Sequence, residues 1–144
     1  MAKIKDDIAR GSAWIARALQ SSGYQADFSP ASLREIDRFF DDHSAAGKPK
    51  AGGLLAQDMG KRLFAVGCYI GEVLRRAKGG DWHGDDADPK VELNVELRFP
   101  GGTVCWPVQR ALKRLQQGPA EGIPAYGVGL GLKTDSLLNP PKGL

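Results

Sequence analysis

Four carboxylates and one imidazole lie within eight residues of each other, in the segment Asp81–Asp88. Oxygen ligands of this kind bind Ca²⁺ or Mg²⁺, but the spacing misses that of an EF-hand loop, which requires a glycine at its sixth position together with a glutamate at its twelfth; counted from Asp81, the sixth residue is Asp86. We interpret it as a solvated acidic connection that a basic partner surface could recognise, in preference to a metal site. Its candidate contact residues are Asp81, His83, Asp85 and Asp86.

A glycine-rich stretch near the end of the chain, Gly127–Thr134 (GVGLGLKT), superficially resembles a phosphate-binding loop. A Walker loop needs glycine directly before its Lys-Thr pair and a helix after it, whereas Leu132 occupies the glycine position and a short, proline-rich segment follows. A dinucleotide-binding interpretation fails because no βαβ unit surrounds the glycines. We therefore expect a terminal strand or extended segment here and no bound cofactor.

The longest predicted helix, 54–78, has a charged and aromatic arc opposite its apolar face. Glu72 lies three and four residues before two arginines, a spacing that favours ion pairs within the helix. A catalytic glutamate would look the same, but no second carboxylate or histidine is positioned with it. Tyr69, flanked by arginines, is typical of an interface anchor, although a loop of the chain could also cover this arc. The arc holds Lys61, Arg62, Tyr69, Glu72 and Arg76.

The remaining reactive residue types do not form a catalytic arrangement in the sequence. Cys68 and Cys105 are expected to be small buried apolar groups, because a catalytic cysteine needs a nearby base and both histidines, His43 and His83, lie in polar segments. We assign no catalytic residue. The three tryptophans are expected in or at the edge of the core. They are Trp14, Trp82 and Trp106.

Hydrophobic periodicity predicts the elements that must position these residues. Helical spacing indicates helices over 6–22, from 29–30 onward, over 54–78 and from 107 to about 118; residues 44–53 indicate a loop. Alternation predicts a strand from Val91 to Phe99, a turn at 100–102 and a returning strand over 103–106, with a further short strand at 81–82. The fold class is therefore α+β. N-terminal helices, one of them long and central, pack on a small antiparallel sheet, followed by a further short helix and an irregular C-terminal segment.

Glycine is the compositional outlier, with 19 residues of 144. Gly60, Gly67 and Gly71 lie within the apolar arc of the long helix, where each costs about 1 kcal/mol relative to alanine. Close approach of another backbone is the expected compensation. A membrane-dimerisation motif is excluded because charged residues, including Glu72, interrupt the segment.

Composition limits the partners and the compartment. The length is typical of a single domain, 1–144, with an irregular tail over 134–144. The formal charge of +3 is too small to indicate nucleic-acid binding, and Glu92 and Glu96 on the wet side of the predicted strand also disfavour it. The N-terminus lacks the apolar run of a signal peptide, and no window approaches a membrane span. We expect a soluble, cytoplasmic protein.

The stretch Leu63–Trp82 resembles a pattern found in small, largely uncharacterised bacterial cytoplasmic proteins, some of immunity-protein type. The pattern is a glycine, an aromatic residue, Gly-Glu, a basic pair and Gly-Gly-x-Trp, which describes a helix, its cap and a strand. The resemblance implies a bacterial protein that could neutralise a cognate interbacterial toxin. The matching positions are Gly67, Tyr69, Gly71, Glu72, Arg75, Arg76, Gly79, Gly80 and Trp82.

The leading hypothesis is a non-enzymatic protein-binding factor, an immunity-like protein that occludes a toxin's active site through the charged helix face and adjoining loops. The alternative is a small enzyme or a ligand- or metal-binding domain that uses Glu72 with His83, Asp85 and Asp86. A self-associating structural domain is a third hypothesis. The oligomeric state stays open.

Overall fold

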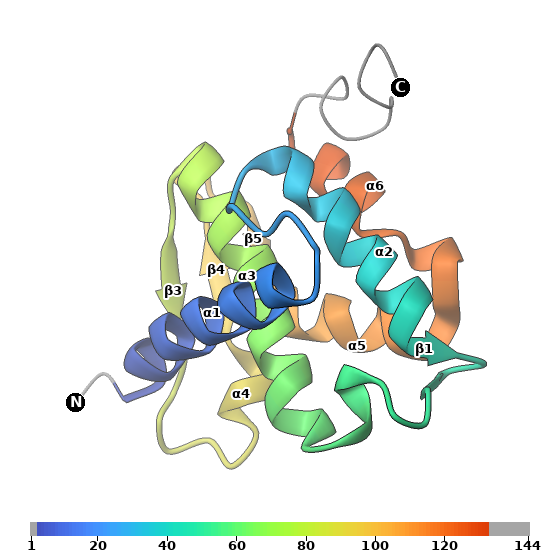
Figure 1. Cartoon of the computed structure of the whole chain (residues 1–144). Helices are drawn as coiled ribbons and strands as arrows, with labels where there is room; N and C mark the ends of the chain where they lie inside the picture. Colours follow the sequence, from blue (N-terminus) through green and yellow to red (C-terminus); the bar gives the residue numbers. More distant parts are fainter. Residues whose placement is uncertain (1–2, 133–144) are drawn as a thin grey trace.

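A computed structural model of the chain describes residues 3–132 (Figure 1). The helices are α1 (Lys3–Ser21), α2 (Leu33–His43), α3 (Met59–Lys78), α4 (Val91–Asn94), α5 (Pro107–Gln117) and α6 (Ile123–Gly129). Single 3₁₀ turns occur at η1 (Pro30–Ser32), η2 (Leu54–Ala56) and η3 (Gly118–Glu121). The strands are β1 (Ser44–Ala45), β2 (Lys48–Pro49), β3 (Asp81–His83), β4 (Glu96–Arg98) and β5 (Val104–Cys105).

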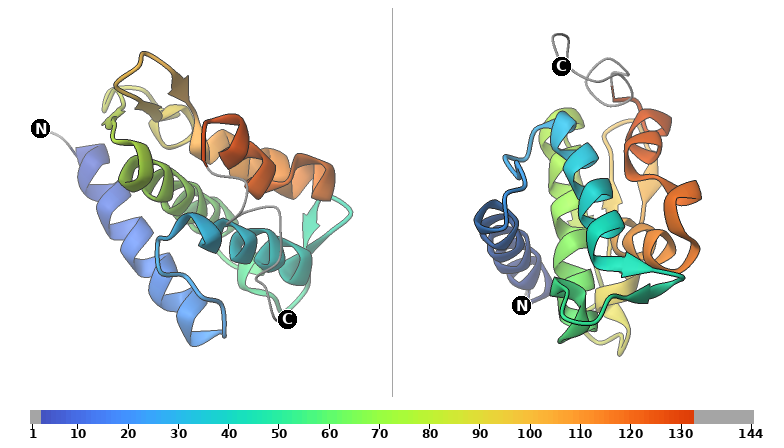
Figure 2. Two further views of the ribbon diagram at one scale, coloured as in Figure 1. Left: turned by 90° about the horizontal axis from the view of Figure 1, so that it is seen from above. Right: turned by 45° about the vertical axis from the view of Figure 1, so that its right-hand side comes forward.

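The long helix α3 runs through the centre of the fold and is buried from Leu63 to Leu74. α1 and α5 pack on different sides of it, as Figure 2 shows from two further directions. A Cβ added at Gly67 would lie 2.5 Å from the Cα of Val108 in α5, and one at Gly71 would overlap the ring of Trp82. The predicted close approach of another backbone is confirmed at Gly67, whereas the close neighbour of Gly71 is the side chain of Trp82.

The other close approach on α3 involves a glycine of its neighbour. A Cβ at Gly11 of α1 would be only 3.6 Å from the Cα of Ala65, so the two helices cross nearly backbone to backbone. Gly60, by contrast, faces open space, and its predicted role in packing is wrong. It lies in the first turn of α3, before the buried part of the helix begins.

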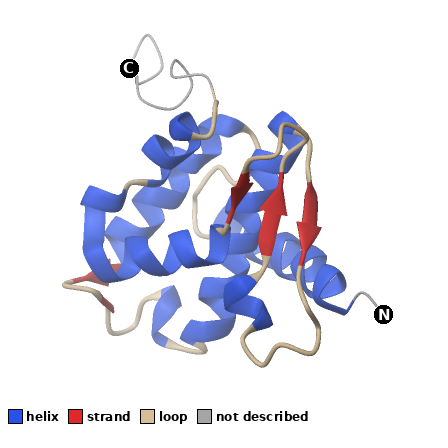
Figure 3. Ribbon diagram, turned by 180° about the vertical axis from the view of Figure 1, so that it is seen from behind, coloured by secondary structure: helices blue, strands red, loops and turns tan. Residues whose placement is uncertain are grey.

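β1 and β2 form a short antiparallel pair, and the larger sheet has three strands and lies at one side of the helices (Figure 3). Its order is β3-β4-β5, with both pairs antiparallel and Trp82 opposite Leu97. The α+β class is confirmed. The predicted strand 91–99 is shorter than expected, because its first four residues form α4. The Asp88 side chain accepts hydrogen bonds from the backbone of Lys90 and the side chain of Asn94, which fold this segment into a turn of helix.

The second difference concerns the glycine-rich end. The segment expected to be extended, Gly127–Thr134, instead starts inside a helix, since α6 covers residues 123–129, and a turn follows at 130–131. Pro124 occupies the first turn, where its missing N–H costs nothing. The backbone N–H of Ile123 donates to the carboxylate of Asp37, a residue 86 positions earlier that caps this end of the helix. The predicted irregular tail, 134–144, lies outside the described residues.

Three further predictions concern the start of the long helix, the two cysteines and membrane spans. The helix expected over 54–78 is split into η2 and α3, and Asp58 between them has a positive φ of 48°. Cys68 and Cys105 are both buried and unpaired, as expected. Among residues 3–132, no helix is long and apolar enough to cross a membrane.

Candidate functional site

The aromatic residue expected to anchor an interface is in fact inside the protein. Tyr69 is fully buried, and its ring stacks on Phe28 at 4.6 Å. Its hydroxyl accepts a hydrogen bond from the Phe28 N–H at 3.0 Å and donates one to the Ser32 hydroxyl at 2.7 Å. The connection between α1 and α2 thus covers this arc of α3, and the prediction of an exposed Tyr69 is wrong. The alternative, cover by the chain's own loop, is what the structure shows.

Glu72 lies beside Tyr69 and is also buried, at 8% exposure. Its carboxylate accepts hydrogen bonds from the Trp82 indole at 2.8 Å and from Arg75 at 2.6 and 2.9 Å. Burial alone would raise the pKa of Glu72, but these hydrogen bonds outweigh it and hold the pKa below its ordinary value. The carboxylate is therefore an ionised structural acceptor, and its predicted place on an exposed arc is wrong.

Arg76, the last residue of the charged and aromatic arc on α3, remains at the surface. The Arg76 guanidinium lies 3.9 Å from the ring centroid of Phe28 and 3.7 Å from the Glu72 carboxylate. It closes the cluster from outside, with about half of its side chain exposed. Arg76 can therefore contact a partner only beside a cluster that is already satisfied internally.

The acidic segment after β3 is largely exposed, but its side chains hold local structure, as shown above for Asp88. Asp86 accepts a hydrogen bond from the Ile4 N–H at 2.9 Å, which ties this loop to the first turn of α1. Asp85 accepts one from the Ala87 N–H at 2.9 Å. Asp81 is exposed and His83 half-buried. Within the part of the chain that the structure describes, no group of three His, Cys, Asp or Glu side chains could hold a metal ion.

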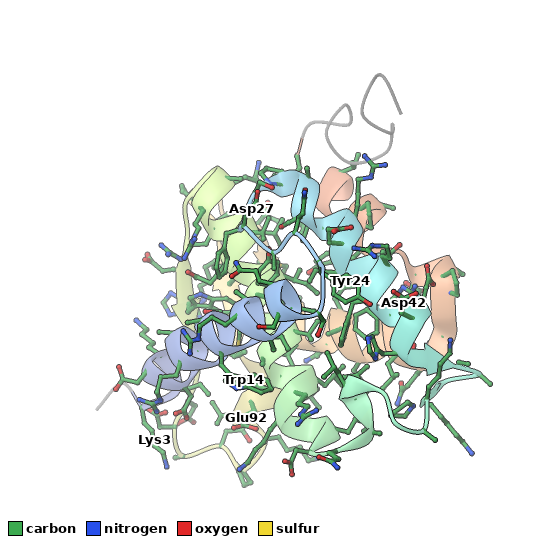
Figure 4. The ribbon with its side chains drawn as sticks, viewed as in Figure 1. Lys3, Trp14, Tyr24, Asp27, Asp42 and Glu92 are labelled. Carbon is green, nitrogen blue, oxygen red and sulfur yellow. The ribbon has the colours of Figure 1, made fainter. Side chains whose placement is uncertain are left out.

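A different surface has an exposed tryptophan. Trp14 is 42% exposed on α1, and Figure 4 shows it on the side of that helix facing the start of α3. It borders a hollow of about 390 Å³, here called the Trp14 groove. The groove is lined by apolar Gly11, Trp14, Phe64 and Ala65 and by charged Asp7, Arg10, Asp58, Lys61, Arg62 and Glu92. Of the three tryptophans expected in or at the edge of the core, Trp82 is buried, whereas Trp14 and Trp106, the latter 45% exposed, lie at the surface.

The wall of the groove is built by Arg62, one of the residues that the sequence selected. Its guanidinium lies 5.7 Å from the Trp14 ring centroid, within the range of a cation–π contact. The same group donates a hydrogen bond of 2.5 Å to the carbonyl oxygen of Leu54 in η2. Behind the indole lies a small apolar cavity of about 50 Å³, which Leu54 and Phe39 also line. The position of Trp14 therefore depends on η2 and α2 as well as on α1.

The groove is narrow at its floor because α1 and α3 meet at Gly11 and Ala65. On the other side of Trp14, a second hollow of about 520 Å³ follows the outer face of α1, between Ala9 and Arg17. Met59, 39% exposed, adds another large apolar side chain at the start of α3. The indole thus stands as a ridge between two depressions.

A further hollow of about 290 Å³ surrounds Trp106. There the Arg110 guanidinium lies 4.5 Å from the Tyr126 ring centroid and pairs with Glu121 at 2.5 Å. Burial raises the pKa of the Cys105 thiol on its wall, so that the thiol stays protonated and unreactive at neutral pH. Arg110 thus has a carboxylate partner, whereas within residues 3–132 Arg62 pairs with no carboxylate.

One buried ionic cluster was missed by the sequence analysis. Arg114 is 1% exposed and donates to Asp37 at 3.0 Å and to Asp41 at 2.7 Å, joining α5 to α2. A signal was present, because Arg114 falls three residues after Ala111 on the buried face of its helix and the two aspartates are spaced four apart. The cluster is structural.

The exposure of Trp14 could also have been predicted from the sequence. It falls about 100° away from Ile15 on the helical wheel, outside the arc of isoleucines that faces the core. An aromatic residue off the apolar arc of an amphipathic helix is a candidate for contact.

Comparison of this chain with protein-family models, with curated proteins and with solved structures gives no match.

Proposed function

We propose that this protein is a non-enzymatic protein-binding factor and that its partner docks on the Trp14 groove. The observation that carries this proposal is the exposed indole of Trp14 held against Arg62 beside a hollow with an apolar floor. Tryptophan and arginine are the residue types that most often dominate binding energy at protein interfaces. A half-exposed tryptophan on a rigid helix pair is already positioned to bind.

The shape of the surface around Trp14 suits a protein partner better than a small molecule. Hollows of about 390 and 520 Å³ flank the indole on its two sides. A partner that covers both hollows must contact both sides of the projecting Trp14 indole, whereas a small ligand is usually enclosed by a single concave pocket. Three acidic and three basic residues line the groove, so its rim favours a partner with both charges.

The acidic loop adjoins this surface. Asp86 accepts its hydrogen bond from Ile4, one turn of α1 before Asp7 at the groove. Asp85 belongs to the same β3–α4 connection, and Asp81 and His83 lie in β3, directly before it. We include this loop in the interface as the region that would meet basic residues of the partner.

The resemblance of residues 63–82 to immunity-type proteins supports a more specific form of the proposal, in which the partner is a toxin whose active site the groove surface occludes. An immunity protein needs a preformed, rigid contact surface rather than reactive groups. The closely packed crossing of α1 and α3 provides such a surface.

The test compares two equally exposed tryptophans. The bait is this chain, and the partner tested is the protein encoded by the adjacent gene, where the toxin of an immunity protein is often encoded. Trp14→Ala should abolish capture of that protein in a pull-down, with a loss in affinity of at least about 30-fold. Trp106→Ala, at a residue of similar exposure, is the matched control and should leave capture unchanged. Equal capture by the two variants, or no complex with the unmodified chain, would refute the proposal.

A further inference from the structure

His43, the last residue of α2, makes a hydrogen bond that only its neutral form can make. Its ring nitrogen Nδ1 accepts a hydrogen bond of 3.0 Å from the backbone N–H of Leu54. The acceptor must be unprotonated, so the ring is neutral with its hydrogen on Nε2. Its face lies against Phe39, with ring centroids 4.8 Å apart.

Both of these neighbours of His43 are also neighbours of Trp14. Leu54 receives the Arg62 hydrogen bond on its carbonyl oxygen while its N–H bonds His43. Leu54 and Phe39 together line the small cavity behind the Trp14 indole. Two short paths, one through the Leu54 backbone and one through the Phe39 ring, therefore connect His43 with the groove.

We infer that His43 is a proton-sensitive latch for the Trp14 groove: protonation removes the acceptor that holds Leu54, and Arg62 and Trp14 then lose their fixed positions. This inference rests on the proposed function, because it assigns a regulation to that same surface. Partner binding is expected to be stronger at neutral pH than in mild acid. Histidine is the side chain whose charge changes in this range.

The groups around His43 favour its neutral form in the folded protein. Burial lowers the pKa of His43 below its ordinary value of 6.5, and Lys50 on the segment after β2 lowers it further. Asp42 on the same helix acts in the opposite direction, but its carboxylate already accepts the Tyr24 hydroxyl at 2.6 Å. The Tyr24 ring, 6.2 Å from the imidazole, covers another side and carries Arg38 on its own face.

The lowered pKa of His43 means that acid weakens its hydrogen bond with Leu54. Since the folded state holds His43 with a lowered pKa, the unfolded or unlatched chain binds more protons in mild acid. The hydrogen bond from Leu54 to His43 is fully present above about pH 6.5, the ordinary pKa, and is lost as the pH falls through the lower pKa of the folded state.

The test uses the isolated full chain and two-dimensional NMR between about pH 8 and pH 5. The Trp14 indole N–H, identified with Trp14→Phe, and the Leu54 amide should shift with the same midpoint as the His43 ring, below 6.5. His43→Asn keeps an acceptor oxygen at the place of Nδ1 but cannot be protonated, so both signals should stay constant. His83→Asn is the control and should titrate like the unmodified chain.

A Trp14 signal that does not move with His43, or that moves equally in His43→Asn, would overturn the inference. These readings need no partner, so they are independent of the proposed function. If the partner is captured through Trp14, the complex should dissociate faster near pH 5.5 than near pH 7.5, and His43→Asn should remove the difference. Partner capture that ignores Trp14→Ala would refute the proposed function while leaving the NMR result intact.

Discussion

The two halves of α3 carry similar residue types and use them in opposite ways. In the C-terminal half, Tyr69 and Glu72 meet Phe28 and Trp82 from elsewhere in the chain, and all their polar atoms are bonded internally. In the N-terminal half, Arg62 meets Trp14, and the indole keeps 42% of its surface exposed. The contact of Arg76 with Phe28 closes the buried cluster around Tyr69 and Glu72, whereas the contact of Arg62 with Trp14 lies at the surface.

This difference shows that composition alone does not identify an interface. Tyr69 and Trp14 are both aromatic residues near arginines. They differ in that another segment of the chain covers Tyr69, whereas Trp14 borders an open groove. The connection between α1 and α2 reaches Tyr69 because the backbone of Phe28 bonds the tyrosine hydroxyl. At Trp14 the described residues supply a wall but no cover.

Removing one aromatic ring from each half should give the largest contrast. Tyr69→Ala is expected to lower the free energy of unfolding by about 4 kcal/mol, since it leaves a cavity and two unsatisfied hydrogen-bond partners. Trp14→Ala should cost only about 1 kcal/mol, because much of the indole is already in water. Urea denaturation of the two variants measures the difference. Equal losses would mean that the two halves are alike.

The glycines of α3 give a second, somewhat smaller contrast. Gly71→Leu should cost about 3 kcal/mol, because its side chain would overlap Trp82. Gly60→Leu adds the same side chain on the same helix in open space, and should leave stability unchanged or raise it by up to about 1 kcal/mol. Thermal unfolding followed by circular dichroism tests both. A tolerated Gly71→Leu would show that β3 can move away from α3.

The smallest contrast concerns the two carboxylates Glu72 and Glu92. Glu72→Gln should lower the free energy of unfolding by about 2 kcal/mol at neutral pH, since the hydrogen bonds from Arg75 and Trp82 lose their charged acceptor. Glu92→Gln, at the exposed edge of the groove, should change it by less than about 0.5 kcal/mol.

The cost of Glu72→Gln should also depend on pH. Because the folded pKa of Glu72 is lowered, its contribution is complete above the ordinary value of 4.5 and is lost as the pH falls through the folded pKa. The stability difference between Glu72→Gln and the unmodified chain should therefore shrink in acid. A difference that is constant from neutral pH down to about pH 3 would contradict the ionised acceptor assigned here.

Much of the fold could be predicted because its signals are local. The spacing of Ile8, Ile15 and Leu19 predicts α1, and the buried glycines of α3 predict close packing against other elements. The failures come from distant or side-chain hydrogen bonds. Asp88 converts the start of a predicted strand into α4 through its side chain, and Asp37 caps α6 across 86 positions. Periodicity carries no information about either contact.

The candidate site could be predicted only in part, for a related physical reason. Arg62 was selected from its place on the polar arc of α3, and it does line the groove. Tyr69 and Glu72 came from the same arc, but a segment about 40 residues earlier covers Tyr69, and Trp82 from β3 bonds Glu72. A helical wheel shows which residues share a face, whereas the tertiary fold decides which part of that face is covered.

The two buried thiols have a practical consequence for work on the groove. Burial raises the pKa values of Cys68 and Cys105, and thiolate is the form that reacts with maleimides. Both should therefore stay unlabelled in the folded protein at neutral pH. A single cysteine introduced at Ala13, in the hollow beside Trp14, can then carry a fluorophore in an otherwise native sequence. Fluorescence from this position would report on the surroundings of Trp14 without removing a native cysteine.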